Sequence, residues 1–277
     1  MHAVTSRDGT RIACDRAGDG PAVVLVGGAL ATGADGAELA ERLAGRFTVY
    51  SFDRRGRGDS TDTAPYAVAR EIEDVEALID AAGGSAFVFG RSSGAALALQ
   101  AAAALGGKVA RLALYEAPYD EADGAAEAWR AFSAELDDLL AADRRGEALA
   151  LFLKIVGTPD QALEAMKASP AWAGMEALAP TIAYDTALLG ADRSIPVDRA
   201  AKVTAPTLVL DGGASRERMP FMAATADKLA RIIPNARRHT IESEGHAVSP
   251  DAMAPVLIAF LSAQAPLSAT FNETRRD

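Results

Sequence analysis

Ser92 has the sequence context of a nucleophile in a turn between a strand and a helix. It is the third residue of GRSSG at 90–94, which fits the pattern G-x-S-x-G and lies between an apolar segment and an alanine-rich one. In such a turn the glycines let the two elements approach, and the helix N-terminus lies beside a developing oxyanion. A serine hydroxyl is a weak nucleophile at neutral pH and requires a base within hydrogen-bond reach. Of the three histidines, His246 is the candidate base, because it lies on an expected loop before the last helix.

Two carboxylates could orient the imidazole of that histidine. Glu116 directly follows the apolar segment 112–115, where a buried carboxylate is costly unless it has a partner such as His246. Asp211 directly follows the apolar segment 206–210, and a turn or capping role would explain it equally well. The sequence favours Glu116 and leaves Asp211 open.

A tetrahedral oxyanion needs two backbone N–H donors. Ser93, the residue after the nucleophile, is expected to supply one of them. The N–H of Ala29 or Gly28, which follow an apolar strand, is expected to supply the other. Arg91 lies inside the serine motif and is the candidate substrate-binding residue. The residue types favour an ion pair of Arg91 with a nearby carboxylate, and contact with an acidic group of the substrate is the other interpretation.

The elements that must position these residues follow from the hydrophobic pattern. Short apolar runs predict strands that are covered on both faces of a parallel sheet, at 22–26, 47–52, 86–89, 112–115 and 206–210. A further strand is expected at 237–241, and an Asp-Gly turn predicts a hairpin of 3–6 with 11–16. Amphipathic or apolar segments predict helices at 37–43, 68–82, 94–105, 221–233 and 252–264. Strands alternating with helices indicate an α/β fold with right-handed crossovers.

The segment 118–202 contains no convincing strand. Helices are expected there at 125–143, 145–156, 161–168 and 175–184. Since a structureless loop of this length would be unusual, the segment is interpreted as an inserted helical subdomain. We therefore expect a core formed by 1–117 and 203–265, a helical cap at 118–202, and a polar C-terminal tail at 266–277.

Four features in this order resemble the α/β-hydrolase superfamily. DRRGRGDS at 53–60 looks like the family turn D-x-R-G-x-G-x-S, and 206–210 looks like the seventh strand. Gly245-His246 resembles the catalytic histidine loop, and the insertion falls where the family has its cap. The resemblance implies the α/β-hydrolase fold, with a mostly parallel central sheet flanked by helices and an inserted helical cap.

The resemblance also bears on the acid. The family most often places it just after the seventh strand, at a position occupied here by Ser215, which cannot stabilise an imidazolium as a carboxylate does. Some members carry the acid at the end of the sixth strand, where Glu116 stands. The sequence therefore departs from the common family pattern at the position of the acid.

The expected activity is that of a serine hydrolase. Ser92 would attack a small hydrophobic carboxylic ester or lactone and form an acyl-enzyme. A cofactor-free haloperoxidase (perhydrolase) or a lyase could use the same scaffold, and so could a non-catalytic small-molecule receptor, because fold alone does not determine function.

Composition excludes several other classes. The chain has 277 residues, a net charge of −10 and an isoelectric point near 4.9, which argues against nucleic acid as a partner. One cysteine cannot form an internal disulfide, and no His, Asp or Glu cluster has the spacing of a metal site. No cofactor is expected, and the expected partner is a small-molecule substrate. No apolar run is long enough to span a membrane, and we expect a cytoplasmic protein.

Overall fold

The fold is built on one eight-stranded sheet. The computed structural model of the protein describes residues 2–263. The strand order is β1-β2-β4-β3-β5-β6-β7-β8, in which β1 and β2 are antiparallel to their neighbours and the remaining strands are parallel. The strands are β1 His2–Thr5, β2 Arg11–Ala17, β3 Ala22–Val26, β4 Thr48–Phe52, β5 Ala86–Arg91, β6 Val109–Tyr115, β7 Thr207–Gly212 and β8 Ala236–Ile241.

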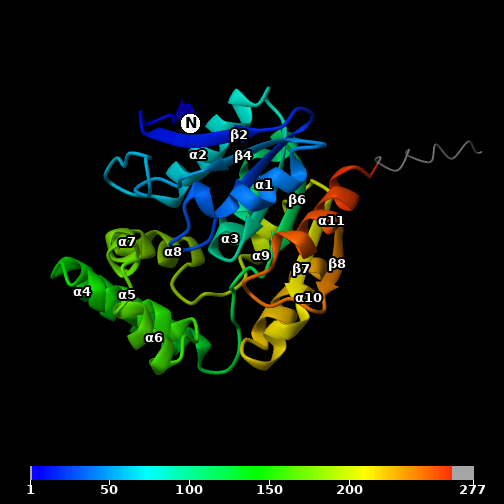
Figure 1. Cartoon of the computed structure of the whole chain (residues 1–277). Helices are drawn as coiled ribbons and strands as arrows, with labels where there is room; N and C mark the ends of the chain where they lie inside the picture. The colour runs from blue at the N-terminus through cyan, green and yellow to red at the C-terminus, as the bar shows by residue number, and fades with distance from the viewer. Residues whose placement is uncertain (1, 264–277) are drawn as a thin grey trace, which may run out of the picture.

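Helices cover both faces of this sheet, as the uniformly apolar central strands require. The flanking helices are α1 Ala37–Leu43, α2 Val68–Ala81, α3 Ser93–Leu105, α10 Phe221–Ile232 and α11 Pro250–Leu261. Buried side chains of α1 and α11 pack together on one face, and those of α2, α3 and α10 pack on the other. Figure 1 shows the two layers on either side of the sheet. The predicted α/β class with a mostly parallel sheet is confirmed.

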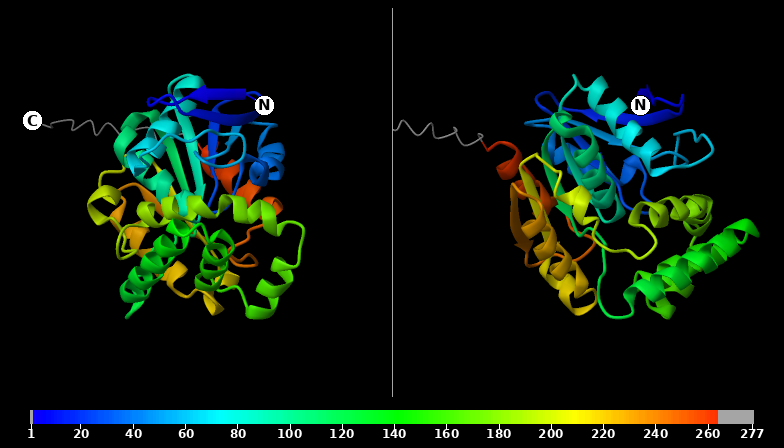
Figure 2. Two further views of the ribbon diagram at one scale, coloured as in Figure 1. Left: turned by 90° about the vertical axis from the view of Figure 1, so that its left-hand side faces the viewer. Right: turned by 180° about the vertical axis from the view of Figure 1, so that it is seen from behind.

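Six helices lie between β6 and β7, which is the segment expected to be the cap. They are α4 Ala125–Ala141, α5 Arg145–Ile155, α6 Asp160–Lys167, α7 Trp172–Leu178, α8 Ile182–Leu189 and α9 Val197–Ala200. Figures 1 and 2 show α4 to α8 gathered at one end of the sheet. The prediction of a single helix at 175–184 is wrong. The chain forms α7 and α8 with a 3-10 turn at Ala179–Thr181 between them, because Pro180 has no amide hydrogen with which to continue a helix.

The cap shares one buried apolar cluster with the rest of the protein. Trp129, Phe132 and Leu136 of α4 belong to the same cluster as Leu99 of α3. The two connections of the cap also meet, since the N–H of Asp120 donates to the carbonyl oxygen of Arg193 at 3.0 Å. The cap therefore packs as a continuation of the core.

The ends of the chain differ slightly from expectation. Helix α11 ends at Leu261, three residues earlier than predicted. The expected tail at 266–277 lies outside the described residues. Among the described residues, every helix is too short or too polar to pass through a lipid bilayer.

Candidate active site

Ser92 occupies the tight turn that joins β5 to α3. Its backbone angles are φ 55° and ψ −130°, a conformation that residues other than glycine rarely adopt. Its N–H donates to the carbonyl oxygen of Tyr115 at 2.9 Å. A Cβ on Gly90 would lie 2.3 Å from the Gly94 carbonyl oxygen, and a Cβ on Gly94 would lie 2.3 Å from the Val26 carbonyl oxygen. Both glycines of the motif are therefore required by the close approach of strand and helix.

The serine, the histidine and Glu116 form one hydrogen-bonded chain. His246 Nε2 lies 3.1 Å from Ser92 Oγ, and His246 Nδ1 lies 2.6 Å from Glu116 Oε2. The N–H of Gly212 donates to Glu116 Oε1 at 2.9 Å, so both carboxylate oxygens have partners. The Glu116 side chain is fully buried, whereas the histidine side chain is 35% exposed. The buried carboxylate thus faces a histidine whose side chain is partly open to solvent.

Local contacts hold the loop that carries the histidine. The Tyr115 hydroxyl, at the end of β6, donates to the carbonyl oxygen of Gly245. The N–H of Ala214 donates to the carbonyl oxygen of Glu244 at 3.0 Å, and the Glu244 carboxylate accepts from Ser249 N and Oγ. Strand β6 therefore positions His246 twice, through the Gly245 backbone and through the adjacent Glu116.

Asp211, the other carboxylate expected for this role, lies elsewhere. Its Oδ1 accepts from Arg238 at 2.7 Å. Burial raises the pKa of Asp211, but hydrogen bonding and the nearby arginine charges together hold it below its usual value. Successive residues of a strand point to opposite faces of the sheet. The Asp211 side chain therefore points away from the face toward which its neighbour Gly212 is directed. The structure therefore does not bring Asp211 to the histidine. Ser215, at the position where the family commonly has the acid, is buried and carries no carboxylate.

The loop after β3 runs directly against Ser92. A Cβ on Gly28 would lie 3.0 Å from Ser92 Cβ and 3.6 Å from Ser92 Oγ. The backbone N–H groups of Gly28, Ala29 and Ser93 donate to no described residue. The expected oxyanion donors thus have no partner among the described residues, and the loop that carries Gly28 and Ala29 runs beside the serine at Gly28.

A buried ion network underlies this loop. Arg57 donates to the Gly28 carbonyl oxygen at 2.6 Å and to Asp185 Oδ2 at 2.8 Å. Arg54 donates to Asp185 Oδ1 at 2.7 Å and to both oxygens of Glu71. Burial raises the pKa of Asp185, but the charges of Arg57 and Arg54 outweigh it and hold that pKa below its usual value. Two arginines and two carboxylates therefore balance one another's charge.

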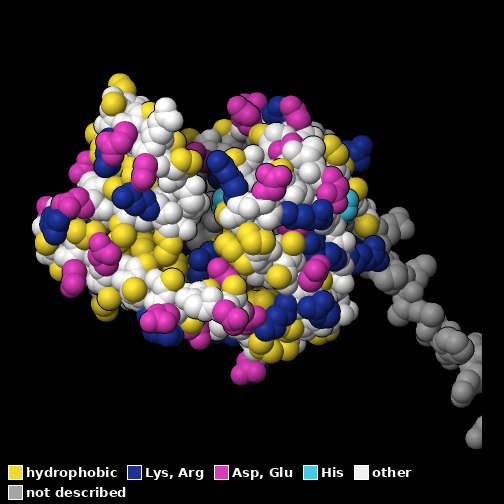
Figure 3. Space-filling model, turned by 90° about the horizontal axis from the view of Figure 1, so that it is seen from below, with side chains coloured by type: hydrophobic (Ala, Val, Ile, Leu, Met, Phe, Trp, Pro, Cys, Tyr) yellow, Lys and Arg dark blue, Asp and Glu magenta, His cyan; other side chains and the backbone are white. Residues whose placement is uncertain are grey.

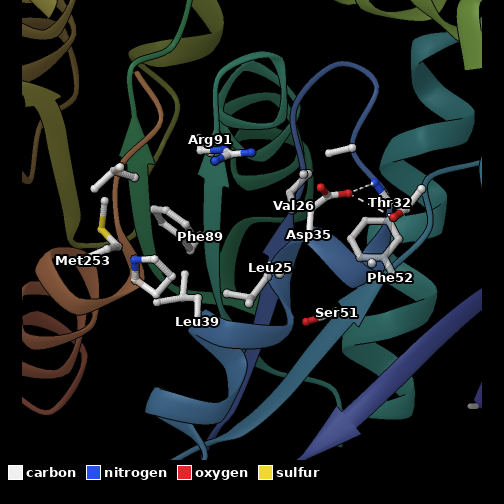
Figure 4. Close-up of a pocket in the computed structure, with 16 residues that line it drawn as sticks. Leu25, Val26, Thr32, Asp35, Leu39, Ser51, Phe52, Phe89, Arg91 and Met253 are labelled. Atoms are coloured by element: carbon white, nitrogen blue, oxygen red, sulfur yellow. Dashed lines mark hydrogen bonds between the residues drawn. The ribbon is translucent and has the colours of Figure 1, made fainter. Parts of the chain in front are cut away.

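Arg91 lies at an apolar pocket on the α1 and α11 side of the sheet. The pocket encloses a cavity of about 70 Å³. Figure 4 shows the Arg91 side chain among the residues that line it. Apolar lining residues include Leu25, Leu39, Phe89, Val248 and Met253. Asp35 also faces the pocket, where its carboxylate accepts hydrogen bonds from Thr32. Within residues 2–263 the Arg91 guanidinium has neither an ion pair nor a hydrogen bond, so the expected alternative of a carboxylate partner is not found.

The face that carries the cap is hollowed. Figure 3 views the molecule from below and shows a depression between the lobe of cap helices and the larger lobe beside it.

Across residues 2–263, no group of three His, Cys, Asp or Glu side chains could hold a metal ion.

Three residues near the candidate site were missed by the sequence reasoning. They are Tyr115, Arg57 and Asp185, which act on the loops rather than on the candidate triad itself. One signal was present in the sequence. Three arginines, at 54, 55 and 57, lie within a span of four residues shortly after an apolar strand. Such a cluster has to find carboxylates if it is buried. Nothing in the sequence identifies those carboxylates.

Comparisons with known proteins show the family to which the chain belongs. Residues 23–257 match the model of the alpha/beta hydrolase family, so the chain belongs to that family. It is similar to an alpha/beta hydrolase from Sphaerobacter thermophilus at 53% identity and a TM-score of 0.85, over 94% of this chain and 100% of that one. The resemblance drawn from sequence is confirmed, and family membership supports hydrolase activity.

Two more distant structures share the fold. An esterase from Exiguobacterium antarcticum is 19% identical, with a TM-score of 0.72 over 94% of this chain and 99% of its own. An enol-lactonase from Burkholderia xenovorans is 20% identical, with a TM-score of 0.68 over 95% and 100%.

Proposed function

We propose that the protein is a serine hydrolase that cleaves small carboxylic esters or lactones through an acyl-enzyme on Ser92. The observation that carries the proposal is the continuous chain of hydrogen bonds from Ser92 Oγ through His246 to the buried Glu116. A nucleophile, a base and a group that orients the base are the parts that this chemistry requires.

In the proposed reaction, Ser92 Oγ attacks the carbonyl carbon while His246 Nε2 takes the hydroxyl proton. The carbonyl oxygen becomes an oxyanion, which accepts hydrogen bonds from the N–H of Ser93 and of Ala29 or Gly28. The C–O bond to the leaving alcohol then breaks as His246 returns the proton to that oxygen. Water attacks the acyl-enzyme by the same route and releases the acid. Glu116 stabilises the imidazolium in both steps.

We further propose that Arg91 and its pocket bind the substrate. The pocket is mostly apolar, borders the loop after β3 and includes Val248, two residues beyond the histidine. A guanidinium without a protein partner can form a charge-assisted hydrogen bond with an anion. The preferred substrate is therefore a small, mostly apolar ester or lactone that also carries a carboxylate. The proposed substrates, esters and lactones, are of the same classes that the names of two proteins with this fold give, an esterase and an enol-lactonase.

A fluorophosphonate probe tests the proposed function, because it labels only serines that are already activated. We expect one adduct on the wild type, located by peptide mapping at Ser92 and absent from Ser92→Ala. We also expect hydrolysis of p-nitrophenyl acetate, with kcat at least about 10⁴-fold lower in Ser92→Ala. An adduct without ester or lactone hydrolysis would favour perhydrolase or lyase chemistry. The absence of both would favour a receptor.

A further inference from the structure

Arg57 is buried against the loop that carries two of the candidate oxyanion donors. Its side chain is 0% exposed. Its three side-chain nitrogens contact the Gly28 carbonyl oxygen at 2.6 Å, Asp185 Oδ2 at 2.8 Å and Thr181 Oγ1 at 3.1 Å. The Gly28 carbonyl oxygen also accepts from the N–H of Ala31, at the longer distance of 3.3 Å. The arginine therefore makes the shorter of the two contacts that hold this carbonyl.

The geometry of the peptide bond links that carbonyl to the candidate donor. The Gly28 C=O and the Ala29 N–H belong to the same planar unit, and in a trans peptide they point in opposite directions. A charged donor that fixes the carbonyl therefore fixes the direction of the N–H as well. A Cβ added to Gly28 would lie 3.0 Å from Ser92 Cβ, so the loop runs close to the serine. A small rotation of this peptide unit would therefore turn the N–H away from the reacting oxygen.

The cap holds the arginine in this position. Asp185 and Thr181, its two side-chain partners, lie on α8 and on the turn that precedes it. The other oxygen of the Asp185 carboxylate accepts from Arg54 at 2.7 Å. Asp185 thus connects the cap to the loop after β3 through Arg57.

We infer that Arg57 is a positioning residue, which aims the Ala29 N–H at the oxyanion and is itself held by Asp185 of the cap. The inference rests on the proposed serine hydrolase function. It makes the cap a structural part of the oxyanion site as well as its cover. Because an oxyanion donor acts in the transition state, the effect of Arg57 belongs to kcat rather than to substrate binding.

Arg57→Met is the direct test, and Arg55→Met is its matched control. Arg55 comes from the same turn, is equally buried and pairs with Asp74 and Asp8, but does not contact the loop after β3. We expect Arg57→Met to lower kcat by about 10- to 100-fold with KM within twofold, somewhat less than the loss of a donor itself. Arg55→Met should leave kcat within about threefold, and Arg57→Lys should fall between wild type and Arg57→Met.

An inhibitor pair separates positioning from general loss of structure. A trifluoromethyl ketone forms a tetrahedral adduct with an oxyanion, whereas the matching carboxylic acid product does not. We expect the inhibition constant of the ketone to rise in Arg57→Met by the factor that kcat loses, with that of the acid unchanged. If Arg57→Met does not fold, Arg57→Lys and Asp185→Asn carry the same comparison.

Three results would overturn the inference. They are an unchanged kcat in the Arg57 variants, an equal loss of kcat in Arg55→Met, or equal effects on ketone and acid. A wild type that hydrolyses esters and reacts with the fluorophosphonate would still support the proposed function in each case. A wild type that does neither would overturn the proposed function itself, and this inference with it.

Discussion

Glu116 combines a strained backbone with a buried charge. Its φ is 48°, a value that few residues other than glycine adopt, and its side chain is fully buried. Such conformations persist where the surrounding structure holds them, and they gather at functional sites. The two hydrogen bonds to its carboxylate explain what the strain achieves, since they place a negative charge against the histidine.

Glu116→Gln tests that role. The substitution keeps the size of the side chain and removes its charge, so the imidazolium loses its stabilising partner. We expect kcat for p-nitrophenyl acetate to fall by about 10³- to 10⁴-fold. Asp211→Asn is the matched control, because it makes the equivalent change at a buried carboxylate that pairs with Arg238. It should lower the melting temperature and leave kcat within about threefold. The reverse ranking of the two variants would exclude Glu116 as the orienting acid.

Arg91→Met tests the proposed substrate class. We expect kcat/KM for a p-nitrophenyl hemisuccinate ester, which carries a carboxylate, to fall by about tenfold or more, since a hydrogen bond to a charged group contributes about 1.5–3 kcal/mol. The value for p-nitrophenyl butyrate, which is neutral, should stay within about twofold. Arg91→Lys should keep part of the preference. Parallel losses for both esters would show that Arg91 does not recognise an anionic group.

At the scale of residues, the sequence predicts features that depend on neighbouring residues in the chain. It does not predict contacts between segments that are far apart in the chain. The serine, the histidine and the adjacent backbone donors could be predicted because each lies in a short motif next to a recognisable strand or helix. The choice between Glu116 and Asp211 could not be made, because it depends on which face of a strand each side chain occupies and on Arg238 of a later strand. The contact of Arg57 with Gly28 joins residues 29 positions apart and has no local signal.

At the scale of elements, α3 packs directly against the end of β3. A Cβ on Gly94 would lie 2.3 Å from the Val26 carbonyl oxygen and 2.5 Å from that of Gly27. Both neighbours are backbone atoms and cannot rotate aside. The position of the nucleophile therefore depends on this helix lying directly on the strand.

Gly94→Ala should consequently be costly. We expect a loss of about 3 kcal/mol in the free energy of unfolding, because overpacked sites cost about 1–3 kcal/mol or more, together with a large loss of fluorophosphonate labelling. Gly107→Ala is the control, since a Cβ there would meet no atom of residues 2–263 within 4 Å beyond its chain neighbours. It should change stability by less than about 1 kcal/mol. Urea unfolding of both variants measures the difference, and equal stabilities would contradict the steric argument.

Most elements could be predicted because their patterns are local. The central strands are short runs of branched and aromatic apolar residues, and α1 has the bounds that its pattern predicts. The exception in the cap, α7 and α8 in place of one helix, arises because an apolar stripe continues through a proline. The pairing of α8 with the turn after β4 depends on Asp185 and could not be read from either segment alone.

For the whole molecule, buried charge makes stability sensitive to acid. Because the folded pKa of Asp185 lies below its unfolded value, the unfolded chain binds a proton first as the pH falls. The stabilisation is complete above the ordinary pKa of an aspartate, near 3.8, and is lost as the pH falls through the lower, folded value.

Asp185→Asn should reveal this contribution. The variant leaves two buried arginines with one carboxylate fewer, so we expect it to be less stable than wild type by about 3 kcal/mol at pH 6. The difference should narrow steadily from pH 5 to pH 3, because the unfolded wild-type chain takes up a proton at Asp185 and an asparagine cannot. Urea unfolding at several pH values provides the measurement. A difference that stays constant or widens as the pH falls would contradict the assignment.

The order in which the chain supplies the candidate site has a consequence during synthesis. Ser92 and Glu116 come from neighbouring central strands, and the hydrogen bond from Ser92 N–H to Tyr115 joins them. The histidine arrives only with the loop after β8, 130 residues beyond Glu116. Because domains emerge from the ribosome N-terminus first, a nascent chain can pair these strands while it still lacks its base. The serine of an unfinished chain would then remain unreactive toward the esters and thioesters of the cell until the last strand and helix dock.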